Sequence, residues 1–221
     1  MKWISLCVML ACAPGQGTSQ NLQNAATSLQ PMTRDGGLPP VRWSHREKAA
    51  IWTRAAWVAL GVHGAPLVSD VPRDIASWCP GYATAGPSDR RAFWVGFLSA
   101  LAKHESTYRA RAIGGGGRYF GLLQITPATA RAYDCRAKSG EALRKGPANL
   151  SCAIRIMAHT VSRDGVISAG MRGVAADWGP LHSGSKRRDM QDWLRRQSYC
   201  VSLPDTRPRA RPERITRLQG R

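Results

Sequence analysis

The sequence predicts a mainly α-helical domain with at most one small β-hairpin. Apolar residues recur at helical spacing in several segments, most clearly at Trp94, Phe97, Leu98 and Leu101, which share one stripe of a helix. The run Gly114–Gly117 cannot form a regular element and permits positive φ angles. We therefore expect helices on both sides of a single glycine turn.

Two helices are expected before that turn. The first would begin at the capping box Ser44–Glu47 and end at Gly61. A turn-rich segment, 66–87, separates it from the second helix, for which Ser88 or Asp89 is the expected N-cap.

Glu105 lies near the C-terminal end of the second helix. It follows Trp94 by eleven residues, which places it about 20° from Trp94 around the helix axis. A carboxylate on an apolar face is costly, and desolvation favours its protonated form. A general acid at neutral pH requires that form. Glu105 is therefore the candidate catalytic residue, and a solvated Glu at a frayed helix end is the alternative interpretation.

Three further helices are expected after the glycine turn. One covers 126–133, with Thr as N-cap and Pro at its first position. The next runs from Asn149 to Gly165 and carries Leu150, Ala153, Ile154, Met157 and Val161 at helical spacing. The last is an amphipathic helix over 186–197.

The pair Glu105-Ser106, the glycine turn and the run Gly121–Ile125 (GLLQI) occur in an order that resembles the soluble lytic transglycosylase (SLT) domain of the lysozyme-like superfamily. In that family, a Glu-Ser pair ends a core helix and a Gly-Leu-Met-Gln-Ile run follows. Leu123 stands here in place of the Met. The resemblance covers residues 92–180 and implies a lysozyme-like helical fold.

The resemblance also implies an activity. Such an enzyme cleaves the β-1,4 bond between N-acetylmuramic acid and N-acetylglucosamine in peptidoglycan and forms 1,6-anhydromuramic acid, without a cofactor or a metal. Most glycosidases need two carboxylates, yet Ser106 through Tyr133 contains no Asp or Glu. In the family, one Glu serves as acid and then base because the substrate's acetamido group supplies the second function. Glu105 takes that role here.

The residues expected to contact or position the substrate are Ser106, Tyr119, Gly121, Gln124, Asn149 and Trp178. Asn149 matches the Asn of the family's Pro-x-x-Asn-Ile run. A role as the plain N-cap of the helix that follows is equally compatible with the sequence. The family's Ala-Tyr-Asn-x-Gly run falls at 173–180, where Asp177 and Trp178 stand in place of Tyr and Asn. The acid therefore lacks the family's supporting hydroxyl. Trp178 would form a wall of the sugar cleft or, alternatively, pack in the core.

Charge and composition indicate anionic partners. The 221 residues carry a formal net charge of +18, which attracts nucleic acid, anionic lipid and anionic cell wall alike. Peptidoglycan is the expected partner, with a cell-envelope secretion or conjugation apparatus as a further candidate. No base-stacking motif supports nucleic acid, and we expect a monomer.

The expected organisation is a signal peptide at 1–13, a flexible linker at 14–42, the domain at 43–200 and a disordered basic tail at 201–221. This order of segments predicts a bacterial protein that is periplasmic or secreted. Lipid anchoring through Cys12 is the alternative. No other apolar run has the length of a membrane span.

Four cysteines remain beyond the leader, and an even number in an exported chain indicates disulfides. Of the three possible pairings, we favour Cys135–Cys152 with Cys79–Cys200. The spacing of Cys and His is not that of a zinc site.

Two other functions compete with the transglycosylase. A lysozyme-type hydrolase would need Asp134, Asp164 or Asp177 near the cleft. The second competing function is that of a non-catalytic exported module that binds the cell wall.

Overall fold

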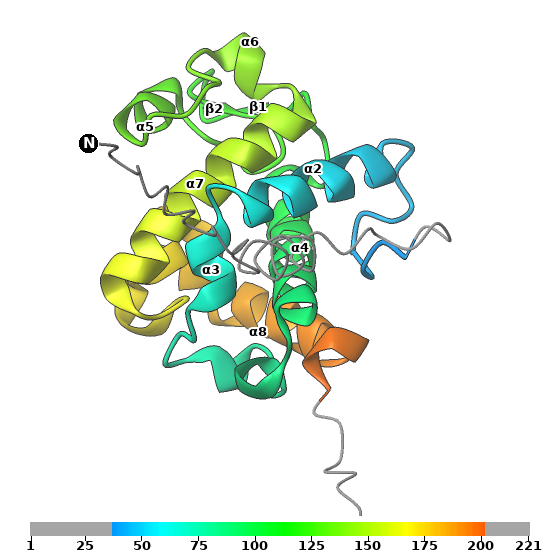
Figure 1. Cartoon of the computed structure of the whole chain (residues 1–221). Coiled ribbons are helices and arrows are strands. Elements are labelled where there is room, and N and C mark those ends of the chain that lie inside the picture. Colours follow the sequence, from blue (N-terminus) through cyan, green and yellow to red (C-terminus); the bar gives the residue numbers. More distant parts are fainter. Residues whose placement is uncertain (1–36, 202–221) are drawn as a thin grey trace, which may run out of the picture. The chain divides into compact units, whose positions relative to one another are not determined.

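The structure is a computed structural model that describes residues 37–201 (Figure 1), all but the first of which belong to the unit Leu38–Arg221. The predicted signal peptide, most of the predicted linker and nearly all of the tail lie outside the described residues. The described helices are α2 (Ala49–Gly61), α3 (Ala65–Ser69), α4 (Pro87–Ser106), α5 (Pro127–Ala132), α6 (Gly140–Leu143), α7 (Gly146–Asp164) and α8 (Gly184–Arg195). The short 3₁₀ turns are η1 (Ile75–Ser77), η2 (Tyr82–Thr84), η3 (Ala169–Met171), η4 (Gly173–Ala176), η5 (Gly179–His182) and η6 (Ser198–Cys200).

One antiparallel hairpin joins the helices on either side of the glycine turn. Strand β1 (Ile113–Gly114) pairs with β2 (Tyr119–Phe120), and Gly115, Gly116 and Gly117 all have positive φ angles. The expected fold class, mainly helical with a small hairpin, is confirmed.

Helix α4 forms the centre of the core, and α2, α3 and α8 pack against it (Figure 1). Every residue from Ala92 to Ala102 is buried, so the buried surface extends around the whole helix rather than along one stripe. The indole N–H of Trp94 donates to the carbonyl oxygen of Leu67 at 2.6 Å, which anchors α3 to α4. The burial of α4 fixes the position of the chain that follows it.

Two helix starts differ from the prediction. Residues 41–48 form turns, and α2 begins at Ala49 without a side-chain cap, because the buried Trp43 anchors this segment through a hydrogen bond to Thr53 (2.9 Å). Helix α4 begins at Pro87 with Gly86 as its N-cap. A proline at the first position favours that start.

The predicted linker ends too late. Arg42 forms an ion pair with Asp189 at 2.6 Å, and its backbone N–H donates to Ser99 Oγ at 2.9 Å. The hydroxyl of Tyr199 donates to the carbonyl oxygen of Pro40 at 3.2 Å. Residues 40–42 therefore belong to the domain, although their composition resembles that of the linker before them.

Both predicted disulfides are present. Cys79–Cys200 has a Cα–Cα distance of 4.7 Å, and Cys135–Cys152 has one of 5.2 Å. The first joins the segment before α4 to the end of the domain, and the second joins the end of α5 to α7.

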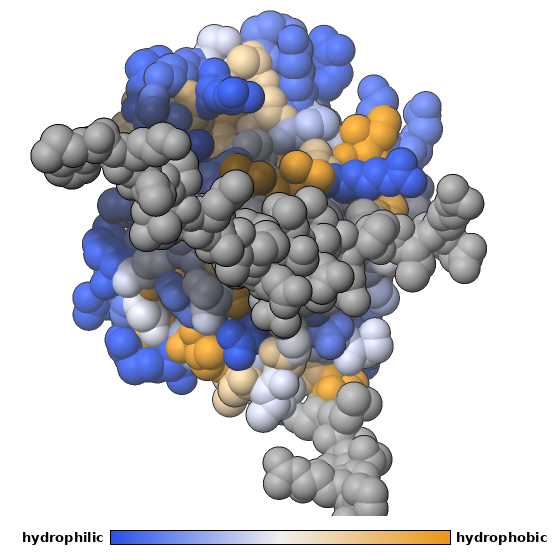
Figure 2. All heavy atoms as spheres, viewed as in Figure 1, coloured by the Kyte–Doolittle hydropathy of each residue, from blue (hydrophilic) through white to orange (hydrophobic). Residues whose placement is uncertain are grey.

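Hydrophilic residues cover much of the visible face of the domain, with hydrophobic residues in separate patches (Figure 2). Within residues 37–201, no helix combines the length and hydrophobicity that a membrane span requires.

Candidate active site

Glu105 lies in the last turn of α4, at the point where the chain leaves the core. Thr107 and Tyr108 follow with φ angles of 51° and 60°, a left-handed conformation that turns the backbone sharply. The N–H of Thr107 bonds to the carbonyl of Ala102, which closes the helix end. Glu105 is half-buried, so its carboxyl is close to the core and still reachable from solvent.

Burial raises the pKa of Glu105 from its ordinary value of 4.5 to about 7. Desolvation penalises the charged form, and the ammonium of Lys186, near the start of α8, lowers the pKa to a lesser extent. Among the residues that the structure describes, no Asp or Glu contributes to this shift. Glu105 can therefore hold a proton near neutral pH without a second carboxylate beside it.

The loop Gly121–Ile125 lies next to this helix end. The hydroxyl of Ser106 donates to the carbonyl oxygen of Leu122 at 2.9 Å, and Phe120 and Ile125 exchange backbone hydrogen bonds of 3.0 Å. The loop is thus tied both to the hairpin and to the residue that follows Glu105.

Asn149, on α7, holds the same loop from its buried side. Its Oδ1 accepts from the N–H of Leu123 at 2.9 Å, and its Nδ2 donates to the carbonyl oxygens of Phe120 (2.9 Å) and Leu143 (3.0 Å). Asn149 is fully buried, and α7 starts three residues before it. The N-cap interpretation is therefore wrong, and the side chain instead joins the backbone of the loop to those of β2 and α6.

Trp178 completes the support of the loop. Its indole N–H donates to the carbonyl oxygen of Leu123 at 3.0 Å, and the side chain is buried. Ser106 and Asn149 are buried as well. Direct contact of these three side chains with a sugar does not fit their burial, because their polar atoms already bond within the protein.

Gly121 and Gln124 shape the loop itself. Gly121 has a φ angle of 83°, and a Cβ there would lie 2.2 Å from the carbonyl oxygen of Leu143. Gln124 also has a positive φ angle, 47°, and its Nε2 donates to the carbonyl oxygen of Gly121 at 2.9 Å. Gln124 is half-buried and Tyr119 is 40% exposed. Of the six predicted substrate residues, these two present side chains to solvent.

The three aspartates of the hydrolase hypothesis are held by other groups. Asp134 pairs with Lys138 at 2.7 Å. Asp164 accepts from Arg163 and from the N–H of Gly173, each at 2.7 Å, and these bonds hold its pKa well below the usual range. Asp177 accepts from the hydroxyl of Tyr133 at 3.4 Å.

The sequence did not predict a network of polar and charged side chains at the end of α4, next to Glu105. The carboxylate of Asp189, on α8, accepts from Arg42 (2.6 Å), Lys103 (3.0 Å) and His104 (2.8 Å). Lys103 and His104 directly precede Glu105, so this network ties α8 to the end of α4. In residues 37–201, no group of three or more His, Cys, Asp or Glu side chains could hold a metal ion.

Comparisons with known proteins cover the segment that contains this site. The family model described as Transglycosylase SLT domain matches residues 84–170, a segment that contains Glu105, the loop Gly121–Ile125 and Asn149. The predicted resemblance to the SLT domain is therefore confirmed.

Among solved structures, "Bd0314 DslA wild-type form 2" is similar to this chain, with a TM-score of 0.68 and 28% identity over 74% of this chain and 98% of that chain. Two mutants of DslA, each with a Glu replaced by Gln, give the same TM-score and identity. No curated protein matches the sequence.

Proposed function

We propose that this protein is a peptidoglycan lytic transglycosylase, which cleaves the β-1,4 bond between N-acetylmuramic acid and N-acetylglucosamine. The observation that carries the proposal is the single carboxyl of Glu105, whose pKa burial raises to about 7, at the helix end beside the loop Gly121–Ile125. Both lie within the segment that matches the SLT domain.

The proton of Glu105 moves twice in the proposed reaction. Protonated Glu105 donates to the glycosidic oxygen, and the leaving N-acetylglucosamine departs as an alcohol. The 2-acetamido oxygen of the muramic acid stabilises the positive charge that develops at C1. The carboxylate of Glu105 then takes the proton of the 6-hydroxyl while O6 bonds to C1. The product is 1,6-anhydromuramic acid, and Glu105 is again protonated.

A pKa near neutral pH suits both steps, since neither protonation state of Glu105 is then far from the other in free energy. The surroundings of Glu105 also support one-carboxylate chemistry, because within residues 37–201 its shifted pKa has burial and Lys186 as its causes and no carboxylate among them. A hydrolase of the usual kind would place a second carboxylate within reach of the sugar.

The remaining site residues take two roles in this proposal. Gln124 and Tyr119, which have solvent-accessible side chains, contact the sugar, and Gly121 positions Gln124 by accepting its side-chain hydrogen bond. Ser106, Asn149 and Trp178 position the loop through the hydrogen bonds described above.

The substrate places the protein outside the cytoplasm. We propose a periplasmic or secreted location in a bacterium, with 1–13 as the signal peptide and lipid attachment at Cys12 as the alternative. The formal charge of +18 favours adsorption to an anionic wall.

Digestion of purified peptidoglycan followed by mass analysis of the muropeptides tests the reaction. We expect products that end in 1,6-anhydromuramic acid, each lighter by one water than the lysozyme product. Glu105→Gln keeps the shape of the side chain without the proton, so turnover should fall by roughly 10²-fold or more. Glu141→Gln, at an exposed site, is the matched control and should retain activity.

Other outcomes would support the competing functions. Products that carry the extra water, and that disappear in Asp134→Asn, Asp164→Asn or Asp177→Asn, would establish a hydrolase. Binding to peptidoglycan without any product would indicate a non-catalytic wall-binding module.

A further inference from the structure

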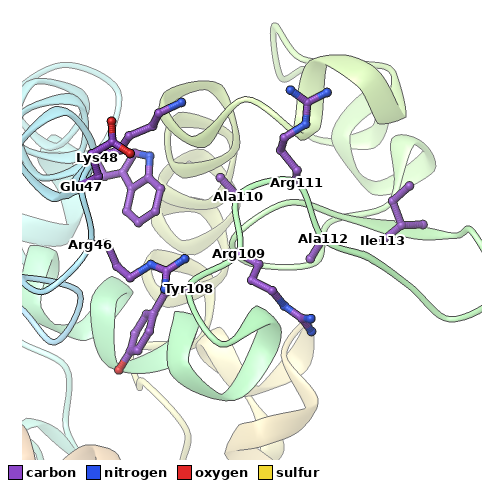
Figure 3. Close-up of a pocket in the computed structure, with 10 residues that line it drawn as sticks. Arg46, Glu47, Lys48, Tyr108, Arg109, Ala110, Arg111, Ala112 and Ile113 are labelled. Atoms are coloured by element: carbon purple, nitrogen blue, oxygen red, sulfur yellow. The ribbon is translucent and has the colours of Figure 1, made fainter.

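A pocket of about 510 Å³ lies between the start of α2 and the segment that follows α4 (Figure 3). Arg46 and Lys48 lie on one side of it, and the chain from Arg109 to Ile113 lies on the other. Glu105 does not line this pocket. However, Arg109 follows Glu105 by four residues, and its Nε donates to the carbonyl oxygen of Ser106 at 3.1 Å. The pocket therefore adjoins the helix end that carries the acid.

The lining of the pocket is strongly cationic. Its lining includes the four cations Arg46, Lys48, Arg109 and Arg111 and a single carboxylate, Glu47. Within the described part of the chain, no ion pair involves any of these five side chains. Asp189, in contrast, pairs with the cations Arg42 and Lys103 and also accepts a hydrogen bond from His104. Four cations and one carboxylate give the pocket a net positive lining, and the resulting potential favours an anionic ligand.

The walls of the pocket are fixed and partly apolar. Trp52 and Tyr108 line it and are buried to more than nine-tenths, and Trp52 packs edge-on against Trp43. Ile113 is 53% exposed at the rim. The pocket thus offers cations for carboxylates together with an apolar surface for small aliphatic groups.

We propose that this pocket binds the peptide stem attached to the muramic acid whose bond Glu105 cleaves. The proposal rests on the proposed function. A stem carries free carboxylates and alanine methyl groups, which match the cations and the apolar rim. A stem of four residues spans up to about 13 Å, and its covalent attachment to the bound sugar raises its effective concentration at a neighbouring site. The protein therefore prefers glycan strands that bear stems.

Kinetics on two substrates test this preference. Glycan strands with intact stems and strands freed of stems by an amidase are compared in the wild type, in Arg46→Gln/Lys48→Gln and in Arg109→Gln/Arg111→Gln. We expect the ratio of kcat/KM for the two substrates to fall about tenfold in each double variant, mainly through KM, because charged contacts to carboxylates are lost. Arg195→Gln/Arg196→Gln removes two exposed charges from the end of α8 and should leave the ratio unchanged.

Binding of a free stem tetrapeptide to Glu105→Gln protein, measured by calorimetry, separates this proposal from the proposed function, since no turnover is involved. The peptide should bind more weakly when its carboxylates are amidated, and more weakly to both double variants. Equal binding of the amidated peptide, no binding at all, or an equal loss in the α8 control would overturn the proposal. So would a pocket variant that loses only binding to anionic vesicles or to DNA.

Discussion

Replacing Glu105 by glutamine is expected to stabilise the protein at alkaline pH while it abolishes the proposed chemistry. The folded state raises the pKa of Glu105 from 4.5 to about 7, so ionisation costs more in the folded chain than in the unfolded one. At about 1.4 kcal/mol for each unit of pKa difference, the extra cost of ionising Glu105 in the folded state amounts to about 3 kcal/mol.

The sign follows from the two pKa values. Protonated Glu105 contributes fully to stability below pH 4.5, and this contribution is lost as pH rises through about 7. Glutamine does not titrate. The variant and the wild type should therefore have similar free energies of unfolding at acid pH, and the variant should exceed the wild type by about 3 kcal/mol at alkaline pH. Asp164 and Asp189, whose pKa values lie well below the usual range, titrate in both proteins and cancel in the difference.

Urea unfolding followed by tryptophan fluorescence, repeated across this pH range, measures the difference. Glu141→Gln is the control, because Glu141 is exposed and forms a surface ion pair with Arg144 three residues away, so its effect should stay below about 0.5 kcal/mol. A difference between Glu105→Gln and the wild type that does not change with pH would refute the reasoning. It would mean that the carboxyl of Glu105 is as well hydrated in the folded state as in the unfolded chain.

Three further predictions concern other parts of the domain. Lys186→Gln removes a charge that lowers the pKa of Glu105, so the alkaline limit of activity should shift to higher pH; an unchanged pH profile would contradict this. Asn149→Ala removes three hydrogen bonds and leaves two buried backbone groups, the N–H of Leu123 and the carbonyl oxygen of Leu143, without this partner, so it should lower the free energy of unfolding by about 3 kcal/mol or more, measured by urea unfolding. Replacing Cys79 and Cys200 by serine opens a loop of 121 residues and should cost up to about 4 kcal/mol; a melting temperature equal to that of the wild type would count against this value.

The elements that the sequence predicted are those with local signals. The helical spacing before Glu105, the glycines of the hairpin and the Thr126 cap each depend on residues close in the chain. The Glu-Ser and GLLQI motifs placed the candidate acid and its loop in the same way. One local pattern gave a wrong prediction. The Ser44–Glu47 capping box does not start a helix, because the buried Trp43 organises this segment as a turn.

The parts that could not be predicted depend on contacts between distant segments. The network joins three segments, since Asp189 on α8 bonds to Arg42, near the start of the domain, and to Lys103 and His104 at the end of α4. Each of these residues alone is an ordinary polar residue in the sequence. Asn149 reads as a helix cap in the sequence, and only the packing of α7 against the loop shows its three partners. The buried position of Trp178 depends on the same packing.

The hydroxyl of Ser106 has a consequence for how the site withstands motion. Ser106 is covalently joined to Glu105, and its side chain bonds to Leu122 in the loop. The loop is also bonded to Asn149 on α7 and to Trp178, so a tilt of α4 that moved Glu105 away from the loop would strain all of these hydrogen bonds. The position of the acid relative to the loop is therefore held from both α4 and α7. We expect distant substitutions that loosen α4 to lower stability well before they lower kcat.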